Sequence, residues 1–434
     1  MEIITAKEYS AFCVDGGRGK LNGYYALKKS TFELLEKFLL ENNKDDADSS
    51  LEIMGLSARR GVGKIITVKN YVGIISLNDG TMIEILPKIY SGNNGDDDRK
   101  ARELLVKMLN VLYNVSYKNL QTADLDVCRM NLLEVFIRMF VDEMLNLTKQ
   151  GLKSNYETLE NNVNCFKGKI LFSKHIRRNF AHKERVYAAY DEFIVNRPEN
   201  RILKSTLICL STRTRSQKTK RDIRNLLSAF DEVEPSRNYD ADFSKIVADR
   251  NTKGYTAALS WARVFLSGKS FTSFSGSTTS MALLFPMEKL FESYVAQKLK
   301  RELPTKFSVN TQDSRYHLFD QPRRFSLRPD IVITDSDGNI FVMDTKWKLL
   351  SGNPNTNYGI SQSDMYQMYV YHKKYNTDGK KVQNVTLIYP QSNAQTEEIC
   401  FRENGGVSVW IKFVDMLEIE KSIQDIKEKI LTAV

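Results

Sequence analysis

The sequence predicts an α+β multidomain protein with three parts: a small α+β module in residues 1–95, a mainly helical middle domain in residues 96–270, and an α/β domain around a mixed sheet in residues 271–434. A chain of 434 residues is long enough for two or three domains that each bury a core. The pattern also changes along the chain. Short strand-like segments come first, helical periodicity follows, and helices alternate with strands in the last part.

The first part has the pattern of short strands and turns. In VKNYVGIISLNDGTMIEILPKIY, two apolar stretches flank Asp79 and Gly80, a pair typical of a hairpin turn, and Pro87 ends the second strand. The segment from Phe32 to Asn43 has the spacing of a helix. The charged, turn-rich stretch 91–100 is the expected linker to the middle domain.

The middle part has the apolar spacing of helices. ARELLVKMLNVLYN and NLLEVFIRMFVDEMLNLTKQG are expected to be helical, and Gly151 suits the end of the second. A third helix should begin after Pro198, and a fourth, KRDIRNLLSAFDEVEP, should end near Pro235. Between them, FKGKILFSKHIRRNFAHKER is expected to form a short hairpin and a basic loop.

The last part alternates helices with strands. After the Ser, Thr and Gly-rich boundary SFSGSTTSMA, the helix FPMEKLFESYVAQKLKREL should start near Pro286. A hairpin follows, and the next helix, SQSDMYQMYVYHKKY, should be capped by Ser361 or Ser363. Strands are expected at Val382 to Pro390 and in VSVWIKFVD, and this order is typical of a compact α/β domain.

The composition indicates a soluble protein, which we expect in the cytoplasm. No stretch approaches the roughly 18 apolar residues that a membrane helix needs, and MEIITAKEYS lacks the features of a signal peptide. The five cysteines are scattered without a CxxC pair, which argues against a zinc site and against a disulfide framework. Any bound metal should therefore have oxygen ligands.

The net charge of +10 is compatible with a polyanionic partner. Two basic segments, KHIRRNFAHKER and TRTRSQKTKRDIR, fit three roles: contact with DNA, contact with a protein partner, or a solvated surface. The candidate DNA-binding residues in them are Lys174, Arg177, Arg178, Lys218, Lys220 and Arg221.

The segment RPDIVITDSDGNIFVMDTKWK carries the predicted chemistry. Asp337 and Gly338 suit a hairpin turn, so Asp330 and Asp344 should come from neighbouring antiparallel strands. Side chains alternate along a strand, so Asp344 and Lys346 should share one face. Burying an acid and a base there costs free energy unless they bind something, and Mg²⁺ with a phosphate would compensate both.

This arrangement predicts hydrolysis of a phosphodiester. Mg²⁺ takes carboxylate, carbonyl and water oxygens, so Asp330 and Asp344 would hold the ion and the Thr345 carbonyl would add a third ligand. Lys346 would orient or help to deprotonate the attacking water and balance the charge that builds on the phosphate in the transition state.

The segments LRPDIVI and DTKWK together resemble the motif of the PD-(D/E)xK nuclease superfamily. The resemblance implies that Glu292, in the upstream LFESYV, completes the metal shell and that Gln367, in the downstream DMYQMYVY, contacts water or substrate. As structural alternatives, Asp330 would begin a strand beside Arg328, and Glu292 and Gln367 would be ordinary helix-surface residues.

The motifs together resemble the McrC family, the nuclease subunit of the McrBC modification-dependent restriction system. They include GIISLNDGTMIEILPKI, KGKILFSKHIRRNF and YDEFIVNRPENRILKSTL, and they extend from Ile65 to Pro390. The resemblance implies a restriction-endonuclease-like C-terminal domain that cuts double-stranded DNA carrying modified bases, with Asp330, Asp344 and Lys346 as its catalytic core. It also implies an N-terminal module that docks on McrB, an AAA+ GTPase ring, and stimulates its GTPase.

Two glycine-rich segments fail as nucleotide-binding loops. In ARRGVGKIITV, Ala58 replaces the first glycine of the GxxxxGK[ST] pattern and Ile65 replaces its Ser or Thr, and GGRGKL near the N-terminus also departs from the pattern. We therefore expect this chain to bind no nucleotide itself, so that a partner must supply the GTPase.

Two other functions remain compatible with the sequence. The chain could be a non-catalytic adaptor that docks on and activates an AAA+ ring, or a stand-alone nuclease acting on free ends or structured DNA. A double-strand break needs two active sites, which is compatible with dimerisation through the nuclease domain, although no sequence patch identifies the interface.

Overall fold

The computed structural model describes most of the chain as a mixed α/β multidomain protein with several sheets. Its contacts define two compact units. Unit 1 contains both ends of the chain, and unit 2 contains the middle, chiefly Leu133–Ser273. The three-domain division expected from the sequence stays a prediction. The described residues are 2–15, 23–42, 53–88, 97–112, 130–246, 254–266, 273–274, 279–376, 381–392, 397–404 and 406–432.

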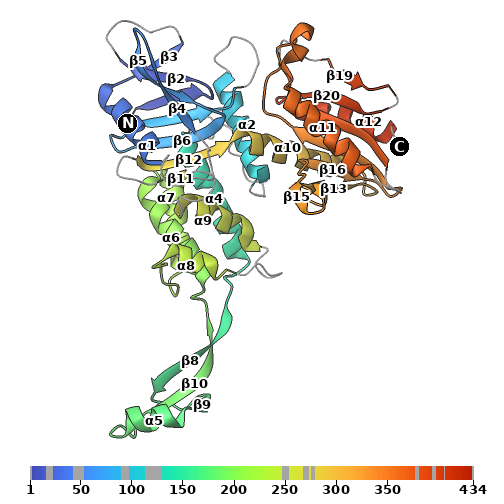
Figure 1. Cartoon of the computed structure of the whole chain (residues 1–434). Coiled ribbons are helices and arrows are strands. Elements are labelled where there is room, and N and C mark those ends of the chain that lie inside the picture. Colours follow the sequence, from blue (N-terminus) through green and yellow to red (C-terminus); the bar gives the residue numbers. More distant parts are fainter. Residues whose placement is uncertain are drawn as a thin grey trace. The chain divides into compact units, whose positions relative to one another are not determined.

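The N-terminal part of unit 1 contains a five-stranded sheet that takes two of its strands from residues 273–286 (Figure 1). The strand β12 pairs antiparallel with β6, although about 200 residues separate them. The predicted hairpin around Asp79 is confirmed, since β6 and β7 are antiparallel and Gly80 has a φ of +85°. In order across the sheet the strands are β1 (Ile3–Lys7), β7 (Met82–Leu86), β6 (Tyr71–Leu77), β12 (Thr279–Pro286) and β11 (Ser273–Phe274).

A second sheet and one helix complete this part. The helix α1 (Lys29–Asn42) and both sheets share one apolar core that includes Phe12, Phe32 and Ile83. The carboxylate of Asp79 joins the elements further, because it accepts hydrogen bonds from Thr31 Oγ1 at 2.7 Å and Thr81 N at 2.8 Å. The four strands in order are β3 (Tyr24–Leu27), β2 (Ala11–Val14), β5 (Gly63–Val68) and β4 (Met54–Arg59).

Glu84 forms a buried polar anchor on β7. Its side chain is fully buried and accepts hydrogen bonds from Arg102 at 2.6 Å and from the backbone N–H of Leu132 at 2.7 Å. Arg102 belongs to α2 (Asp97–Leu112), and Leu132 begins α4 (Leu132–Lys149). An unpaired carboxylate would be costly at this depth, so the two partners hold α2 and the start of α4 on the sheet.

Unit 2 is a helical body with a long antiparallel hairpin (Figure 1). The helix α6 begins at Pro198, as predicted, and Ser216 caps α7, which ends at Ala229 and so several residues before Pro235. Besides α4, the elements are β8 (Asn155–Val163), β9 (Lys169–Ile170), α5 (Phe172–Asn179), β10 (Val186–Ile194), α6 (Pro198–Arg213), α7 (Gln217–Ala229), α8 (Tyr239–Ser244) and α9 (Thr256–Leu266).

The basic segment expected to be a loop contains the helix α5, so that expectation was wrong. The helix lies at the far end of the hairpin (Figure 1). It is held by tertiary contacts: the Asn179 amide exchanges two hydrogen bonds of 2.7 Å with Asn162, and the Tyr187 N–H donates to His175 Nδ1 at 3.3 Å. A helix of eight residues is marginal by itself, which is why periodicity did not reveal it.

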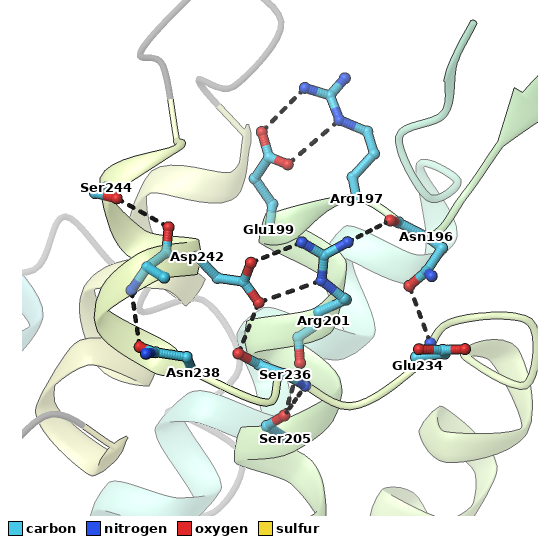
Figure 2. Close-up of polar contacts among 11 residues, drawn as sticks. Asn196, Arg197, Glu199, Arg201, Ser205, Glu234, Ser236, Asn238, Asp242 and Ser244 are labelled. Carbon is cyan, nitrogen blue, oxygen red and sulfur yellow. Dashed lines mark hydrogen bonds and ion pairs between the residues drawn. The ribbon is translucent and has the colours of Figure 1, made fainter. Parts of the chain in front are cut away.

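An ion pair holds α8 against α6 (Figure 2). Arg201 donates to both carboxylate oxygens of Asp242, at 2.6 and 3.2 Å, and to the Asn196 carbonyl at 2.9 Å. Ser236 Oγ donates to the same carboxylate at 2.7 Å. The hydrogen bonds from Arg201 lower the pKa of Asp242, so this carboxyl stays charged and keeps its partners.

The C-terminal part of unit 1 contains the predicted mixed sheet, in which β17, β18 and β20 are parallel and the outer neighbours are antiparallel. The helix α11 packs on one face, where Met368, Tyr371 and Tyr375 join Val342 and Leu387 in the core. In order the strands are β13 (Ser308–Thr311), β16 (Ile331–Thr334), β17 (Asn339–Thr345), β18 (Lys381–Pro390), β20 (Ser408–Val414) and β19 (Ile399–Arg402).

Three helices and a small hairpin surround this sheet. The helix α10 (Met287–Glu302) follows β12 directly, and Lys298 on it is paired with Glu420 on α12 (Ile419–Thr432). Ser361 caps α11 (Gln362–Tyr375), as one of the two predicted alternatives. The remaining elements are β14 (His317–Asp320), β15 (Arg323–Ser326) and the 3-10 helix η3 (Pro354–Gly359). Within the described ranges, no helix is long and apolar enough to span a membrane.

The pairing of β6 with β12 depends on a glycine. Gly73 has a φ of +137°, and a Cβ built there would lie 2.0 Å from the backbone carbonyl oxygen of Leu283. We expect Gly73→Ala to lower the free energy of unfolding by about 3 kcal/mol or more, because the strands must separate to admit the methyl group. Thermal unfolding of the purified chain measures this loss.

Gly61→Ala is the matched control for that substitution. Gly61 also has a positive φ, +85°, but nothing lies within 4 Å of its Cβ position. It should lose only about 1–2 kcal/mol, the usual cost of left-handed backbone for alanine. Equal losses in the two variants would show that the close approach at Gly73 does not matter.

Candidate active site

The hairpin β16–β17 places Asp330 and Asp344 side by side. Ile331 pairs with Met343, so continuing this antiparallel register by one residue sets Asp330 opposite Asp344. The turn is closed by Asp335, whose Oδ1 accepts hydrogen bonds from the backbone N–H groups of Asp337 and Asn339. Opposite residues of an antiparallel pair share a face of the sheet, so the predicted juxtaposition of the two acids is confirmed.

Asp330 is held in place by both of its oxygens. Oδ2 accepts two hydrogen bonds of 2.7 Å from the Thr345 N–H and hydroxyl, and Oδ1 accepts one of 3.1 Å from Gln312 Nε2. The Gln312 N–H also donates to the Asp330 carbonyl at 3.0 Å. Thr345 thus fixes the orientation of Asp330, and its carbonyl as a metal ligand stays a prediction.

Glu292 joins the same network from α10. Its Oε1 accepts a hydrogen bond of 2.6 Å from Gln312 Nε2, so the Gln312 amide bridges Glu292 and Asp330. Sequence reasoning missed Gln312, because it lies outside the nuclease motif, one position beyond β13, and nothing local distinguishes it from other polar residues. The fold of the sheet, and not the local sequence, places the Gln312 amide next to both acids.

Lys346 and Gln367 complete the set. Lys346 Nζ contacts Asp344 Oδ2, which confirms that the two share one face, and donates to Gln367 Oε1 at 3.3 Å. The Gln367 amide nitrogen donates to the Tyr371 hydroxyl at 2.7 Å, one turn further along α11. The structure therefore brings together all five residues that the sequence proposed for catalysis.

The surroundings of the site disfavour the ionised form of each of its acids. Burial, followed by the charge of Asp330, raises the pKa of Glu292 to about 7. Burial also raises the pKa of Asp330 and of Asp344, and for Asp344 the neighbouring Asp330 adds to the effect. Burial alone would lower the pKa of Lys346, but Asp344 and Asp330 outweigh it and raise this pKa. The Lys346 ammonium thus lies close to Asp344 and Asp330.

The donor set fits a hard divalent cation. Its carboxylates come from Asp330, Asp344 and Glu292, and Mg²⁺ prefers such oxygen ligands. Among the described residues, no three His, Cys, Asp or Glu side chains are gathered into a ready-made metal cluster. Instead, Gln312 donates to two of the acids and Lys346 contacts the third, so N–H donors satisfy the carboxylates.

A tryptophan next to Lys346 connects the site to the N-terminal strands. Trp347 Nε1 donates to both oxygens of Glu8, at 3.0 and 2.9 Å, and its ring lies 5.3 Å from the ring of Phe291. Glu8 is 2% exposed and also accepts from the Lys88 N–H at 2.8 Å. Sequence reasoning missed this contact because 339 positions separate Glu8 from Trp347.

The six candidate DNA-binding residues lie on two separate helices of unit 2. Lys174, Arg177 and Arg178 are on α5, at the end of the hairpin, and the other three, Lys218, Lys220 and Arg221, are on α7 in the helical body (Figure 1). Lys174 is paired with Glu160, and the Arg178 guanidinium lies over the Tyr187 ring at 5.2 Å. They form no single basic surface, and their role stays a prediction.

The segment ARRGVGKIITV, which fails the sequence pattern of a phosphate-binding loop, lies in the β-hairpin β4–β5. Ala58 on β4 pairs with Lys64 on β5, and Gly61 and Gly63 at the turn have positive φ values. A phosphate-binding loop instead joins a strand to a helix. The other segment, GGRGKL, lies outside the described residues.

Comparisons with known proteins agree with the resemblance of the motifs. A family model for a McrBC 5-methylcytosine restriction system component matches residues 66–390. A relative from Escherichia coli (strain K12), described as the type IV methyl-directed restriction enzyme EcoKMcrBC, is 24% identical over 312 residues, which are 66% of this chain and 86% of the relative.

Two solved structures share the fold. The first is a refined half-complex from a tetradecameric assembly of Thermococcus gammatolerans McrB AAA+ hexamers with bound McrC, with a TM-score of 0.69, 18% identity and full coverage of both chains. The second is the cryo-EM structure of the Thermococcus gammatolerans McrBC complex, with a TM-score of 0.50 and 20% identity over 69% of this chain and 87% of the other.

The burial of Glu8 predicts how the stability of the chain depends on pH. Burial raises the pKa of Glu8 to about 7, from 4.5 in an exposed carboxyl, despite the opposing hydrogen bonds from Lys88 and Trp347. Between these values the folded state binds the proton more tightly than the unfolded state, so stability falls as the pH rises through this range. From pH 5 to pH 8 the loss should be about 2–3 kcal/mol.

Glu8→Gln should remove this pH dependence, because the amide is neutral at every pH. We expect the variant to match the original chain in thermal midpoint near pH 5 and to exceed it at pH 8. Glu302→Gln, at an exposed position on α10, is the matched control and should change neither value. If the thermal midpoints of Glu8→Gln and the original chain differ by the same amount at pH 5 and pH 8, the pH dependence does not come from Glu8.

Proposed function

Because the chain belongs to the McrBC family of restriction-system components and has a McrC-type fold, we propose that it is the nuclease subunit of such a system. In this proposal it is a Mg²⁺-dependent endodeoxyribonuclease of the PD-(D/E)xK type. The observation that carries the proposal is the convergence of Asp330, Asp344, Glu292 and Lys346 at the end of one β-hairpin.

The excess of acid is the physical argument for a cation. Burial and neighbouring acids raise the pKa values of Glu292 and Asp344, and burial raises that of Asp330, so the protein alone stabilises the ionised carboxylates poorly and a bound cation would favour them. Asp330, Asp344 and Glu292 would hold Mg²⁺, which when bound polarises the phosphate and lowers the pKa of a bound water. A structural ion pair would need only one of the acids, so three of them favour a metal site.

The other residues would position the reactants. Lys346 carries its charge on the side of the acids, where it can orient the attacking water and balance the charge that builds on the phosphate. Gln367 accepts from Lys346 and is itself held by Tyr371, so it limits the freedom of the ammonium group. Thr345 keeps Asp330 turned toward the site.

The proposed partner is an AAA+ GTPase ring of the McrB type, which would recognise double-stranded DNA with modified bases. The solved structure with the higher TM-score contains McrB AAA+ hexamers with bound McrC. The hairpin at Ala58–Lys64 offers no phosphate-binding loop, so GTP hydrolysis is assigned to the partner. We assign docking on the ring and stimulation of its GTPase to the N-terminal module, and a double-strand break would require two copies of the nuclease site.

The first test is Asp344→Asn, which keeps the shape of the side chain and removes its charge. Cleavage of modified plasmid with Mg²⁺, GTP and the partner ring should fall by about 100-fold or more, since a metal ligand is lost, while stimulation of the GTPase persists. Asp337→Asn, in the exposed turn of the same hairpin, should leave both activities unchanged.

Three outcomes would contradict parts of this proposal. Cleavage at the original rate by Asp344→Asn would show that Asp344 is not a ligand in the catalytic site. Cleavage by the original chain without any ring would favour a stand-alone nuclease, and GTPase stimulation without cleavage under any condition would favour a non-catalytic adaptor.

A second test detects the cation without relying on activity. A ligand that binds only the folded state raises its thermal midpoint, so 10 mM Mg²⁺ should raise the midpoint of the original chain measurably. Asp330→Asn should abolish most of this shift, because it removes a central ligand. A shift of the same size in this variant would place the ion elsewhere.

A further inference from the structure

The connection between β13 and β16 carries a small hairpin, β14–β15, that begins and ends at the candidate active site. Gln312, five positions before β14, donates to Glu292 and Asp330, and Asp330 lies four positions after the end of β15. The base of the hairpin is closed by a hydrogen bond of 2.9 Å from the Leu327 N–H to the Tyr316 carbonyl. Short segments therefore connect both ends of the hairpin to the acids of the site.

The base of the hairpin is firmly anchored on α11. The Tyr316 ring lies 4.5 Å from the Tyr375 ring, and Leu327 packs against the core of this domain. Lys374, also on α11, pairs with Asp320 at 3.0 Å. Since α11 also carries Gln367, the same helix sets the position of the hairpin and of a residue in the site.

The outer part of the hairpin is exposed along its whole length, from Leu318 to Ser326. Two phenylalanines stand out there. Phe319 is 55% exposed and Phe325 is 70% exposed, and their rings meet edge to face at 5.9 Å. Phe325 has a φ of +59°, a conformation that an aromatic residue seldom adopts, and strained backbone of this kind concentrates at functional positions.

The same hairpin carries unbalanced positive charge. Arg323 and Arg324 are both exposed, and within the part of the chain that the structure describes neither forms an ion pair. The acid on the hairpin, Asp320, is paired with Lys374 instead. Arg324 lies opposite Phe319 in the ladder, which places a guanidinium and an aromatic ring on one face.

This chemistry matches duplex DNA. Arginines bind phosphates, and phenylalanine side chains make apolar contacts with base edges in the grooves of a duplex. A protein partner would more commonly meet an apolar patch with satisfied charges at its rim. The location of the hairpin favours DNA over a protein partner, because the hairpin is connected to a site whose proposed substrate is a phosphodiester.

Resting on the proposed nuclease function, we propose that β14–β15 is a DNA-contact element of the nuclease domain. Arg323 and Arg324 bind backbone phosphates next to the scissile one, and the pair of Phe319 and Phe325 packs against the adjoining sugars and base edges. The hairpin thereby sets the position of the duplex on the acids.

The test measures binding of the full-length chain, in the Asp344→Asn background, to a fluorescent duplex by anisotropy at several salt concentrations. Adding R323A and R324A together should weaken binding at least tenfold and reduce the slope of log K against log salt by about 2, because two phosphate contacts are lost. R323K with R324K should retain most of the affinity and the slope, which guards against misfolding as the cause.

Two further variants complete the experiment. F319A with F325A should weaken binding while leaving the salt slope unchanged, since no charge is removed. K421A with K427A, on α12, removes the same charge elsewhere in the domain and should leave the affinity nearly unchanged.

Several results would overturn the inference. One is a variant with R323A and R324A that binds the duplex with unchanged affinity and an unchanged salt slope. Another is equal weakening of binding by K421A with K427A. The third is no measurable binding of the duplex by the Asp344→Asn chain at low salt. Normal DNA binding with loss of GTPase stimulation would instead assign the hairpin to the partner ring. Failure of the nuclease function itself is seen separately, as absence of plasmid cleavage by the original chain.

Discussion

The arrangement of this domain depends on the cost of placing three carboxyl groups at the end of one β-hairpin. Asp330 and Asp344 face each other across β16 and β17, and Glu292 approaches from α10. Burial raises the pKa values of all three groups, and the charge of Asp330 adds to the effect on Glu292 and Asp344, so each needs a compensating donor or cation. Gln312 and Lys346 supply the donors, and the proposed divalent ion would supply the missing charge.

The N-terminal strands are connected to this site. Trp347 follows Lys346 and is bonded to Glu8, which lies directly after the first strand. The strand β12 pairs with β6 in the N-terminal sheet and leads without interruption into α10, which carries Glu292. The N-terminal strands and the acidic site therefore share covalent and hydrogen-bonded connections, which agree with the proposal of a nuclease subunit that a partner controls.

Much of the fold could be predicted because local chemistry specifies it. Asp79 with Gly80, and Asp337 with Gly338, mark turns whose flanking residues alternate as strands do, and both hairpins are present. The elements that were missed have weak local signals. The helix α5 is short, and β12 lies in a stretch whose Ser and Thr content is typical of loops, so only contacts with distant residues define them.

The sequence by itself determined the identity and order of the acidic site: Asp330, Asp344 and Lys346 follow from a turn and from the period of two along a strand, which are properties of neighbouring residues. Tertiary structure alone decided that Gln312 bridges two acids, that Glu8 receives the Trp347 N–H, and that β12 completes an N-terminal sheet. These contacts join residues far apart in the chain, and their energies come from burial that exists only after folding.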